Sequence, residues 1–151
     1  MPPPHSPGVP FIDEHLPLLL TRAAAAVSSG GDASPHRLDI TAPAGRVLAA
    51  LSDMPDTPVG RLAKTCALQQ PTVTKVLAQM ERSGLVRRHQ DSQDQRVVRV
   101  ALTPQGQALA ADLLLAAKQH EAKLLAHYPP AGEIKDVLRA LIAQGVRGTR
   151  R

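Results

Sequence analysis

Cysteine and aromatic residues are almost absent from this chain of 151 residues. It has one cysteine, one phenylalanine, one tyrosine and no tryptophan. The lone Cys66 permits no internal disulfide, which excludes a disulfide-stapled fold and favours a reducing compartment. With Phe11 and Tyr128 as the only aromatic rings, few positions are available for ring stacking on a ligand.

Long apolar runs are also missing. The longest apolar stretches, near residues 16–20 and 108–117, are short or interrupted by polar residues, whereas a membrane-spanning helix needs about 20 apolar residues. The opening MPPPHSPGVP lacks the order of basic and then apolar residues that marks a secretion signal. We therefore expect a cytoplasmic, globular protein of one domain, without a membrane partner.

Patterns typical of enzymes and metal sites are not found either. There is no Ser/His/Asp order, carboxylate pair or glycine-rich phosphate loop. The six histidines are scattered, with no pair four residues apart in one helix and no second cysteine to complete a zinc site. We therefore expect no catalytic residue, no bound metal and no required cofactor.

Acidic residues are scarce in one segment, residues 61–99. It holds eight basic side chains and three acidic ones, whereas the rest of the chain has ten of each. The net charge of +5 therefore lies wholly in this segment, as expected of a surface that binds a polyanion. A solvated basic face without a partner is the alternative.

Three short helices are predicted between residues 41 and 83 by apolar residues at helical spacing. Thr41 is expected to cap the first helix and Thr57 the second, which would begin at Pro58. The third begins near Gln70 and stops at Gly84, a residue suited to a left-handed C-terminal cap. Their expected inward-facing residues are Val47, Leu48, Leu51, Val59, Leu62, Ala63, Cys66, Val73, Val76, Leu77 and Met80.

A β-hairpin is predicted directly after these helices. LVRRH (85–89) and RVVRVALT (96–103) are rich in β-branched residues and flank the polar QDSQDQ. The second and third helices form a helix-turn-helix, and a hairpin after it makes a winged helix. The predicted fold is mainly α with a small β-hairpin wing, its winged helix-turn-helix covering about residues 41–102.

Long helices rich in Ala and Leu are predicted on both sides of this unit, over about 11–29, 103–128 and 131–145. Pro17 fits the first of them only within its first turn, and residues 1–10 form a disordered, proline-rich arm. The long helices have more apolar surface than the central unit can cover, so we expect a homodimer. A monomeric helical bundle is the alternative.

The third short helix, which starts near Gln70, leaves polar side chains on its outer face. Thr72, Thr74, Lys75, Gln79 and Arg82 are of the types that bind base edges or phosphates in a DNA major groove. The sequence therefore predicts a protein that binds double-stranded DNA. A helical module that binds an acidic protein or RNA through its basic strip is the alternative.

Residues 57–106 are similar to the core of the MarR family of bacterial transcription regulators. The similarity rests on the turn between Leu62 and Leu68, on PTVTKVLAQMERSGLV, on the wing DSQDQR and on LTPQG, and the flanking helices match the family's dimerisation elements in position. It implies one MarR-like domain over residues 11–151 and, in a bacterial cytoplasm or nucleoid, a homodimeric repressor on a pseudo-palindromic operator. It also implies that Arg96 enters a minor groove and that Asp94 partly neutralises Arg87, Arg88 or Arg96.

Together, the outer face and the resemblance give ten predicted DNA-binding residues. They are Gln70, Thr72, Thr74, Lys75, Gln79, Arg82, Arg87, Arg88, Asp94 and Arg96.

The turn of the helix-turn-helix departs from the family pattern at three positions. Cys66 replaces the usual Leu, Ala67 a common Gly, and Gln69 a Ser or Asp cap. Ala67 implies that the turn either avoids a left-handed conformation or accepts strain, and Gln69 predicts a weaker cap. Because some MarR-like regulators use a reactive cysteine, a redox-responsive regulator acting through Cys66 is an alternative to its role as small core filler.

A small-molecule effector is the last implication of the resemblance, since MarR relatives commonly bind small aromatic or phenolic anions. The region between the first two helices and the long helix after the wing is the expected pocket. Its candidate ligand-binding residues are His15, His36, Asp39, Arg46 and His120.

Overall fold

The computed structural model describes residues 10–29, 40–127 and 131–148. It is mainly helical with one small sheet, as predicted. The predicted arm at residues 1–10 lies, apart from Pro10, outside the described residues. In chain order the elements are α1 (Phe11–Glu14), α2 (Leu16–Ser29), α3 (Ala42–Asp53), β1 (Thr57–Pro58), α4 (Val59–Thr65), α5 (Gln70–Arg82), β2 (Val86–Gln90), β3 (Val98–Leu102), α6 (Pro104–Leu125) and α7 (Ala131–Gly148).

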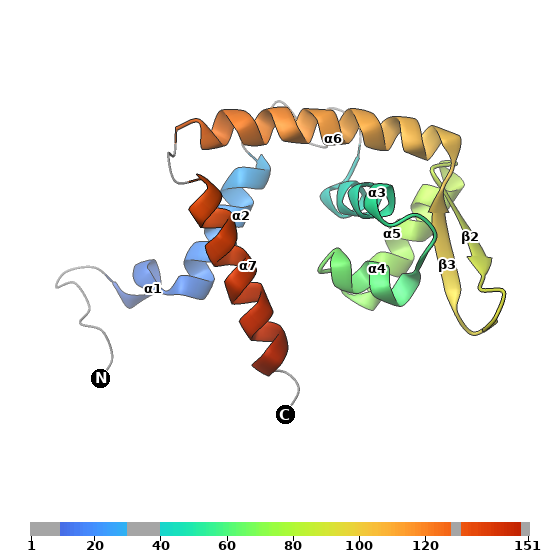
Figure 1. The fold of residues 1–151 in the computed structure, drawn as a ribbon, viewed down its shortest axis with the longest axis horizontal. Helices are drawn as coiled ribbons and strands as arrows, with labels where there is room; N and C mark the ends of the chain where they lie inside the picture. The colour runs from blue at the N-terminus through green and yellow to red at the C-terminus, as the bar shows by residue number, and fades with distance from the viewer. Residues whose placement is uncertain (1–9, 30–39, 128–130, 149–151) are drawn as a thin grey trace.

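The long helix α6 runs along one side of the molecule and connects its two parts (Figure 1). The sheet and α3, α4 and α5 lie beneath its first half, where α3 packs against it. Beneath its second half lie α1, α2 and α7. No described helix has the length and apolarity needed to cross a membrane.

The core of the winged helix lies between α3, α4, α5 and the sheet. Leu48, Leu51, Leu62 and Leu77 are each at most 1% exposed, because apolar residues at helical spacing turn one face of each helix inward. Val100 of β3 closes the core from the sheet side. Of the predicted inward-facing residues, Val59 and Val76 are half-buried at its edge and the other nine are buried.

The sheet has three strands in the order β1-β3-β2, one more than the predicted hairpin. The extra strand pairs Thr57 with Val100. The prediction that Thr57 caps the following helix is therefore wrong, since its hydroxyl instead donates to the carbonyl oxygen of Met54 at 2.5 Å. Helix α4 begins at Val59, and Pro58 before it makes no side-chain cap bond.

The N-terminal helix is broken at His15, whereas the sequence predicted one helix over 11–29. His15 is extended, with φ −70° and ψ 110°, between α1 and α2. A continuous helix would drive the Pro17 ring into the carbonyl group of Asp13. As the second residue of α2, Pro17 occupies the first turn, where its missing N–H costs nothing.

The start of α6 is fixed to the junction between α5 and β2. The Thr103 hydroxyl accepts the N–H of Gly106 at 3.0 Å and donates to the carbonyl of Gly84 at 2.5 Å. Gly106 lies so close to the chain that an added Cβ would stand 2.0 Å from the carbonyl oxygen of Leu85. This contact fixes the direction in which α6 leaves the wing.

Candidate nucleic-acid interface

The outer face of α5 presents the polar side chains that the sequence predicted. Thr74, Lys75, Gln79 and Arg82 are exposed, whereas Val73, Leu77 and Met80 on the opposite face are buried. Thr72 is half-buried, and the Thr74 hydroxyl donates to the carbonyl of Gln70 at 3.0 Å. The face thus displays hydrogen-bonding and cationic groups of the kinds that contact bases and phosphates.

The turn before α5 is strained at Ala67. Its φ of +51° lies in the left-handed region, which disfavours residues with a Cβ. This decides between the two possibilities left by the sequence: the turn accepts strain. At the next helix start, Gln69 makes no side-chain cap bond, so the partial positive charge of the N-terminus of α5 stays open to a phosphate.

Cys66 is packed inside this turn. Its side chain is 4% exposed, and burial raises the pKa of its thiol. A thiol of raised pKa holds little thiolate at neutral pH, which is the form that reacts with oxidants. The structure therefore favours a packing role for Cys66 over redox sensing.

A depression of about 480 Å³ separates α5 from the wing. Gln70 and Thr74 line it from α5, and Arg88 and Arg96 line it from the hairpin. Four of the ten predicted DNA-binding residues, which lie up to 26 positions apart in the sequence, therefore share one concave surface. Two of its lining residues are arginines, whose guanidinium groups can bind phosphate oxygens.

The two wing aspartates have different roles, and that of Asp94 is not the one expected. Asp94 was predicted to neutralise a neighbouring arginine side chain, but its Oδ1 accepts the backbone N–H of Arg96 at 3.0 Å. Asp91 instead holds a different arginine, Arg99, which was not among the expected partners: its Oδ2 lies 2.9 Å from Nη1 of Arg99. Asp91 Oδ1 also accepts the N–H groups of Gln93 and Asp94, which closes the wing turn and, more than the arginine, lowers the pKa of Asp91.

Arg87 and Arg88 point to opposite faces of β2, as neighbours on a strand must. Arg88 donates to a carboxylate, since its Nε and Nη2 lie 2.9 and 2.5 Å from Glu81 Oε2. Its side chain also lines the depression beside α5. Arg87 lines a second depression, of about 500 Å³, between α3, the sheet and α6. The structure therefore brings Arg88 together with the α5 residues and leaves Arg87 apart from them.

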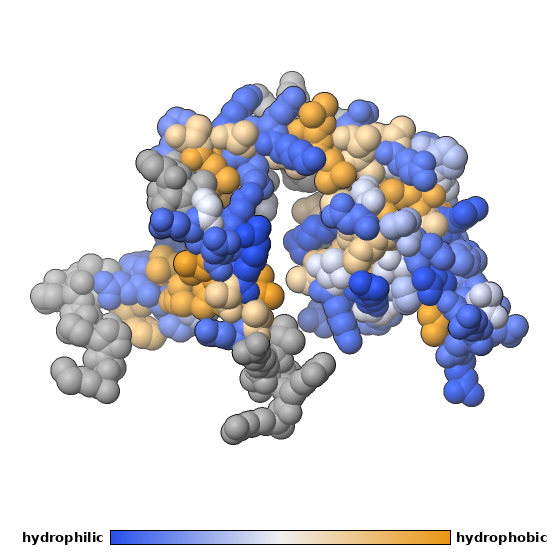
Figure 2. Space-filling model, in the orientation of Figure 1, coloured by the Kyte–Doolittle hydropathy of each residue, from blue (hydrophilic) through white to orange (hydrophobic). Residues whose placement is uncertain are grey.

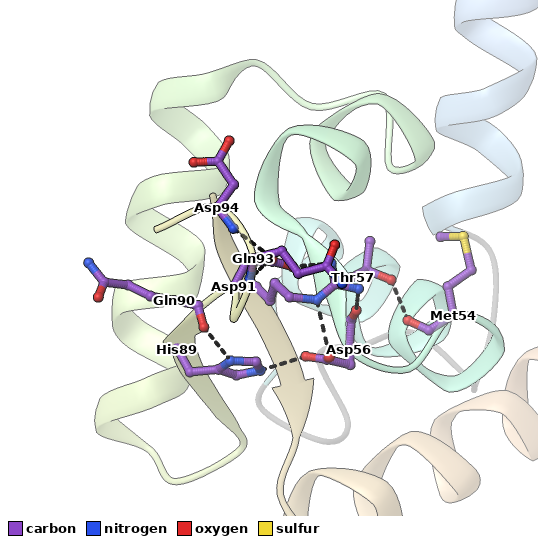
Figure 3. Close-up of polar contacts among 9 residues, drawn as sticks. Met54, Asp56, Thr57, His89, Gln90, Asp91, Gln93 and Asp94 are labelled. Atoms are coloured by element: carbon purple, nitrogen blue, oxygen red, sulfur yellow. Dashed lines mark hydrogen bonds and ion pairs between the residues drawn. The ribbon is translucent and has the colours of Figure 1, made fainter. Parts of the chain in front are cut away.

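A polar cluster near the turn end of the two wing strands was not predicted from the sequence. Asp56, in the turn between α3 and β1, lies 2.6 Å from Nε2 of His89 and 3.1 Å from Nε of Arg99 (Figure 3). Arg99 also donates through Nη2 to the Asp56 carbonyl at 2.6 Å. Because 33 and 43 residues separate the partners, the only local signal was the pairing of His89 with Arg99 across the hairpin.

Three of the five predicted effector residues are described, and their recorded contacts are with different partners. The His15 ring lies 5.1 Å from the Phe11 ring and is tilted 42° to it. Arg46 donates to the carbonyl of Cys66 at 3.3 Å, and His120 lies 3.1 Å from the carbonyl of Val27. His36 and Asp39 lie outside the described residues. Within the described ranges, no three His, Cys, Asp or Glu side chains are grouped as a metal site would require.

Comparison with known proteins agrees with this geometry. The MarR family profile matches residues 40–98. The chain is 32% identical over 96 residues to the homoprotocatechuate degradative operon repressor of Escherichia coli, a match that covers 64% of the chain and 65% of that protein. It therefore spans less than two thirds of the length of this curated relative.

Solved structures cover more of the chain. A MarR family transcriptional regulator from Silicibacter pomeroyi is 34% identical, with a TM-score of 0.80 over 89% of this chain and 98% of its own. MepR of S. aureus, solved with DNA, has a TM-score of 0.71 over 85% of this chain and 97% of its own, and at 23% identity it supports the fold alone. The chain belongs to the MarR family of transcriptional regulators, and its winged helix is that family's fold.

Proposed function

We propose that this protein is a sequence-specific repressor that binds double-stranded DNA through α5 and the wing. The observation behind the proposal is the concave surface on which Gln70, Thr74, Arg88 and Arg96 converge. It lies within the segment that contains the whole net positive charge of the chain. Repression, as opposed to activation, is supported by the name of the E. coli relative.

The proposed DNA complex is formed by a homodimer. Apolar side chains on α1, α2 and α7 lie exposed in the single chain, among them Phe11, Leu16, Val137 and Ile142 at 51–68%. Figure 2 shows hydrophobic residues gathered over this part of the molecule, whereas the wing is mainly hydrophilic. Apolar surface of this extent is usually covered by a partner, and a second copy places two α5 helices on one operator.

Selection from a random-sequence pool of duplexes tests binding directly. Purified protein is used to recover bound duplexes, and the affinity for a selected duplex is compared with that for a scrambled one. We expect about a thousandfold preference and a logarithmic salt slope of about 0.9 per phosphate neutralised. Equal affinity for the two duplexes at every salt concentration would contradict a sequence-specific function and favour a general polyanion-binding module.

The dimer has a separate test. Ile142→Lys places a charge on the exposed apolar face of α7 and should shift the protein from dimer to monomer in sedimentation equilibrium. Ala108→Lys, on an exposed position of α6 beside the winged helix, is the matched control and should stay dimeric. A wild-type protein that sediments as a monomer at all concentrations would exclude this assembly.

Effector response is the remaining part of the proposal. We propose that a small aromatic or phenolic anion binds between the dimerisation helices and the winged helix. The anion favours a dimer in which the distance between the two α5 helices does not match the spacing of successive major grooves. Two recognition helices must stand about 34–36 Å apart to enter successive major grooves, so a ligand that prefers another spacing releases DNA. Screening simple aromatic carboxylates and phenols for release of the selected duplex tests this.

A further inference from the structure

Asp56 ties the wing to the turn between α3 and β1, just ahead of the helix-turn-helix. Its two carboxylate oxygens have different partners on the hairpin: Oδ1 faces His89 of β2 at 2.6 Å and Oδ2 faces Arg99 of β3 at 3.1 Å. Arg99 reaches on to Asp91 at the wing turn at 2.9 Å. A single chain of contacts therefore runs from the α3–β1 turn across both strands to the tip of the wing (Figure 3).

The backbone of Asp56 is held in an uncommon conformation. Its φ of +56° places it in the left-handed region, where Asp and Asn are the most tolerated residues after Gly. The Arg99 Nη2–H donates to its carbonyl oxygen at 2.6 Å. The turn is thus shaped so that the carboxylate faces the hairpin, and such strained positions persist only where the surroundings fix them.

The contacts of His89 favour its charged form. Its Nε2 faces the Asp56 carboxylate at 2.6 Å and its Nδ1 faces the carbonyl oxygen of Gln90 at 3.1 Å. Both neighbours accept hydrogen bonds and neither can donate one. A neutral imidazole has only one N–H, so only the imidazolium form satisfies both contacts.

We propose that Asp56 is a positioning residue for DNA binding: with His89 in its charged form and Arg99, it fixes the angle of the wing and so places Arg96 against the DNA. The proposal rests on the proposed DNA-binding function of the wing. None of the three residues lines the depression beside α5. In this proposal, their effect on DNA acts through the position of the hairpin.

The charges around His89 determine the direction of the pH effect. Asp56 from the turn attracts its proton, Arg87 on its own strand repels it, and Arg99 and Asp91 complete the surrounding charges. The Gln90 carbonyl and then Asp56 raise the pKa of His89 above 6.5. The tie is thus complete below about pH 6.5 and weakens as the pH rises through the raised pKa of the folded protein.

Asp56→Asn is the decisive variant because it removes the charge and retains a residue that tolerates a positive φ. Removing an acid near DNA ordinarily strengthens binding, since it lowers repulsion of the phosphates. The proposed role predicts the opposite: affinity for the selected duplex falls about threefold to tenfold, within the range expected for two exposed ion pairs. Asp53→Asn, an exposed acid at the end of α3, makes the same charge change and should bind DNA as well as or better than wild type.

The pH profile separates positioning from a direct contact with DNA. At constant ionic strength, wild-type affinity should fall between pH 6 and pH 8 through the part contributed by His89. His89→Gln should bind DNA weakly and His89→Arg should bind it strongly at both pH values. Neither variant should show the pH dependence that His89 contributes. If His89 instead touched phosphate directly, the pH dependence would persist in Asp56→Asn, and this result would overturn the proposal.

A measurement without DNA tests the tie independently of the proposed function. The pKa of His89, followed by NMR of the imidazole ring in the full-length protein, should drop in Asp56→Asn and stay unchanged in Asp53→Asn. An unchanged His89 pKa in Asp56→Asn would overturn the tie. If the His89 pKa is lowered in Asp56→Asn but the selection recovers no preferred duplex, the proposed function is refuted and the contact between Asp56 and His89 still stands.

Discussion

Arg88 and Glu81 join the wing to the end of α5 through two hydrogen bonds to one carboxylate oxygen. The Arg88 backbone N–H adds a third contact, to Glu81 Oε1 at 3.3 Å. The Arg88 guanidinium is the main cause that lowers the pKa of Glu81. Together with Asp56 on the other face of the sheet, this pair fixes the hairpin from both sides.

Two substitutions separate the structural role of this pair from a contact with DNA. Arg88→Ala removes both the contact with Glu81 and the guanidinium group, whereas Glu81→Gln removes the ion pair and keeps the Arg88 guanidinium beside α5. If Arg88 neutralises a phosphate, Arg88→Ala lowers the salt slope of DNA binding by about 0.9, and Glu81→Gln leaves the slope unchanged. Equal slopes for both variants and wild type would show that Arg88 acts only within the protein.

Ala67→Gly should stabilise the protein, because glycine accepts a φ of +51° without the strain of a Cβ. We expect a gain of about 1 kcal/mol in the free energy of unfolding, after allowance for the entropy of glycine in the unfolded chain. Urea denaturation followed by circular dichroism measures it. Ala108→Gly, at an exposed position inside α6, is the control and should cost about 1 kcal/mol.

Gly106→Ala should destabilise the junction of the wing and α6. The added methyl group would meet the carbonyl oxygen of Leu85 at 2.0 Å and its carbon at 2.9 Å, both backbone atoms. The chain must shift to relieve this contact, at a cost of about 1–3 kcal/mol. Gly60→Ala, where no atom lies within 4 Å of the new methyl, should be neutral or stabilising in the same urea experiment; a loss of similar size there would contradict the steric explanation.

Much of the fold could be predicted from the sequence because its signals are local. Thr41 and Thr103 cap the helices that follow them, and Gly84 takes a positive φ of 71°. Apolar spacing correctly identified the buried faces of α3, α4 and α5. Each of these features depends on residues within about four positions of one another, which a pattern of spacing can detect.

Features that depend on distant partners were missed. Thr57 resembles a helix cap in the sequence, but its pairing with Val100, 43 residues later, makes it a strand. The same holds for Asp56, whose partners His89 and Arg99 become neighbours only after the hairpin folds back on the α3–β1 turn. In the wing, Asp91 and Asp94 are equivalent by sequence, and only the turn geometry shows which one faces Arg99.

Lys75→Ala and Arg96→Ala should affect DNA binding in different ways. Lys75 is exposed on the outer face of α5, where a major-groove contact would read base edges. We expect Lys75→Ala to relax base preference at one or two operator positions, with a loss of about 1–3 kcal/mol in discrimination there. Thr74→Ala should have a similar but smaller effect.

Arg96, on the exposed wing, should instead contribute affinity that depends little on sequence. Arg96→Ala is therefore expected to weaken binding to the selected and scrambled duplexes by a similar factor. Lys118→Ala, which removes one charge from an exposed position in the second half of α6, is the control for net charge. Repeating the selection with each variant and comparing the recovered sequences measures the difference. An intact affinity and salt slope in Arg96→Ala would mean that the wing does not touch DNA, because a lost phosphate contact must appear in both quantities.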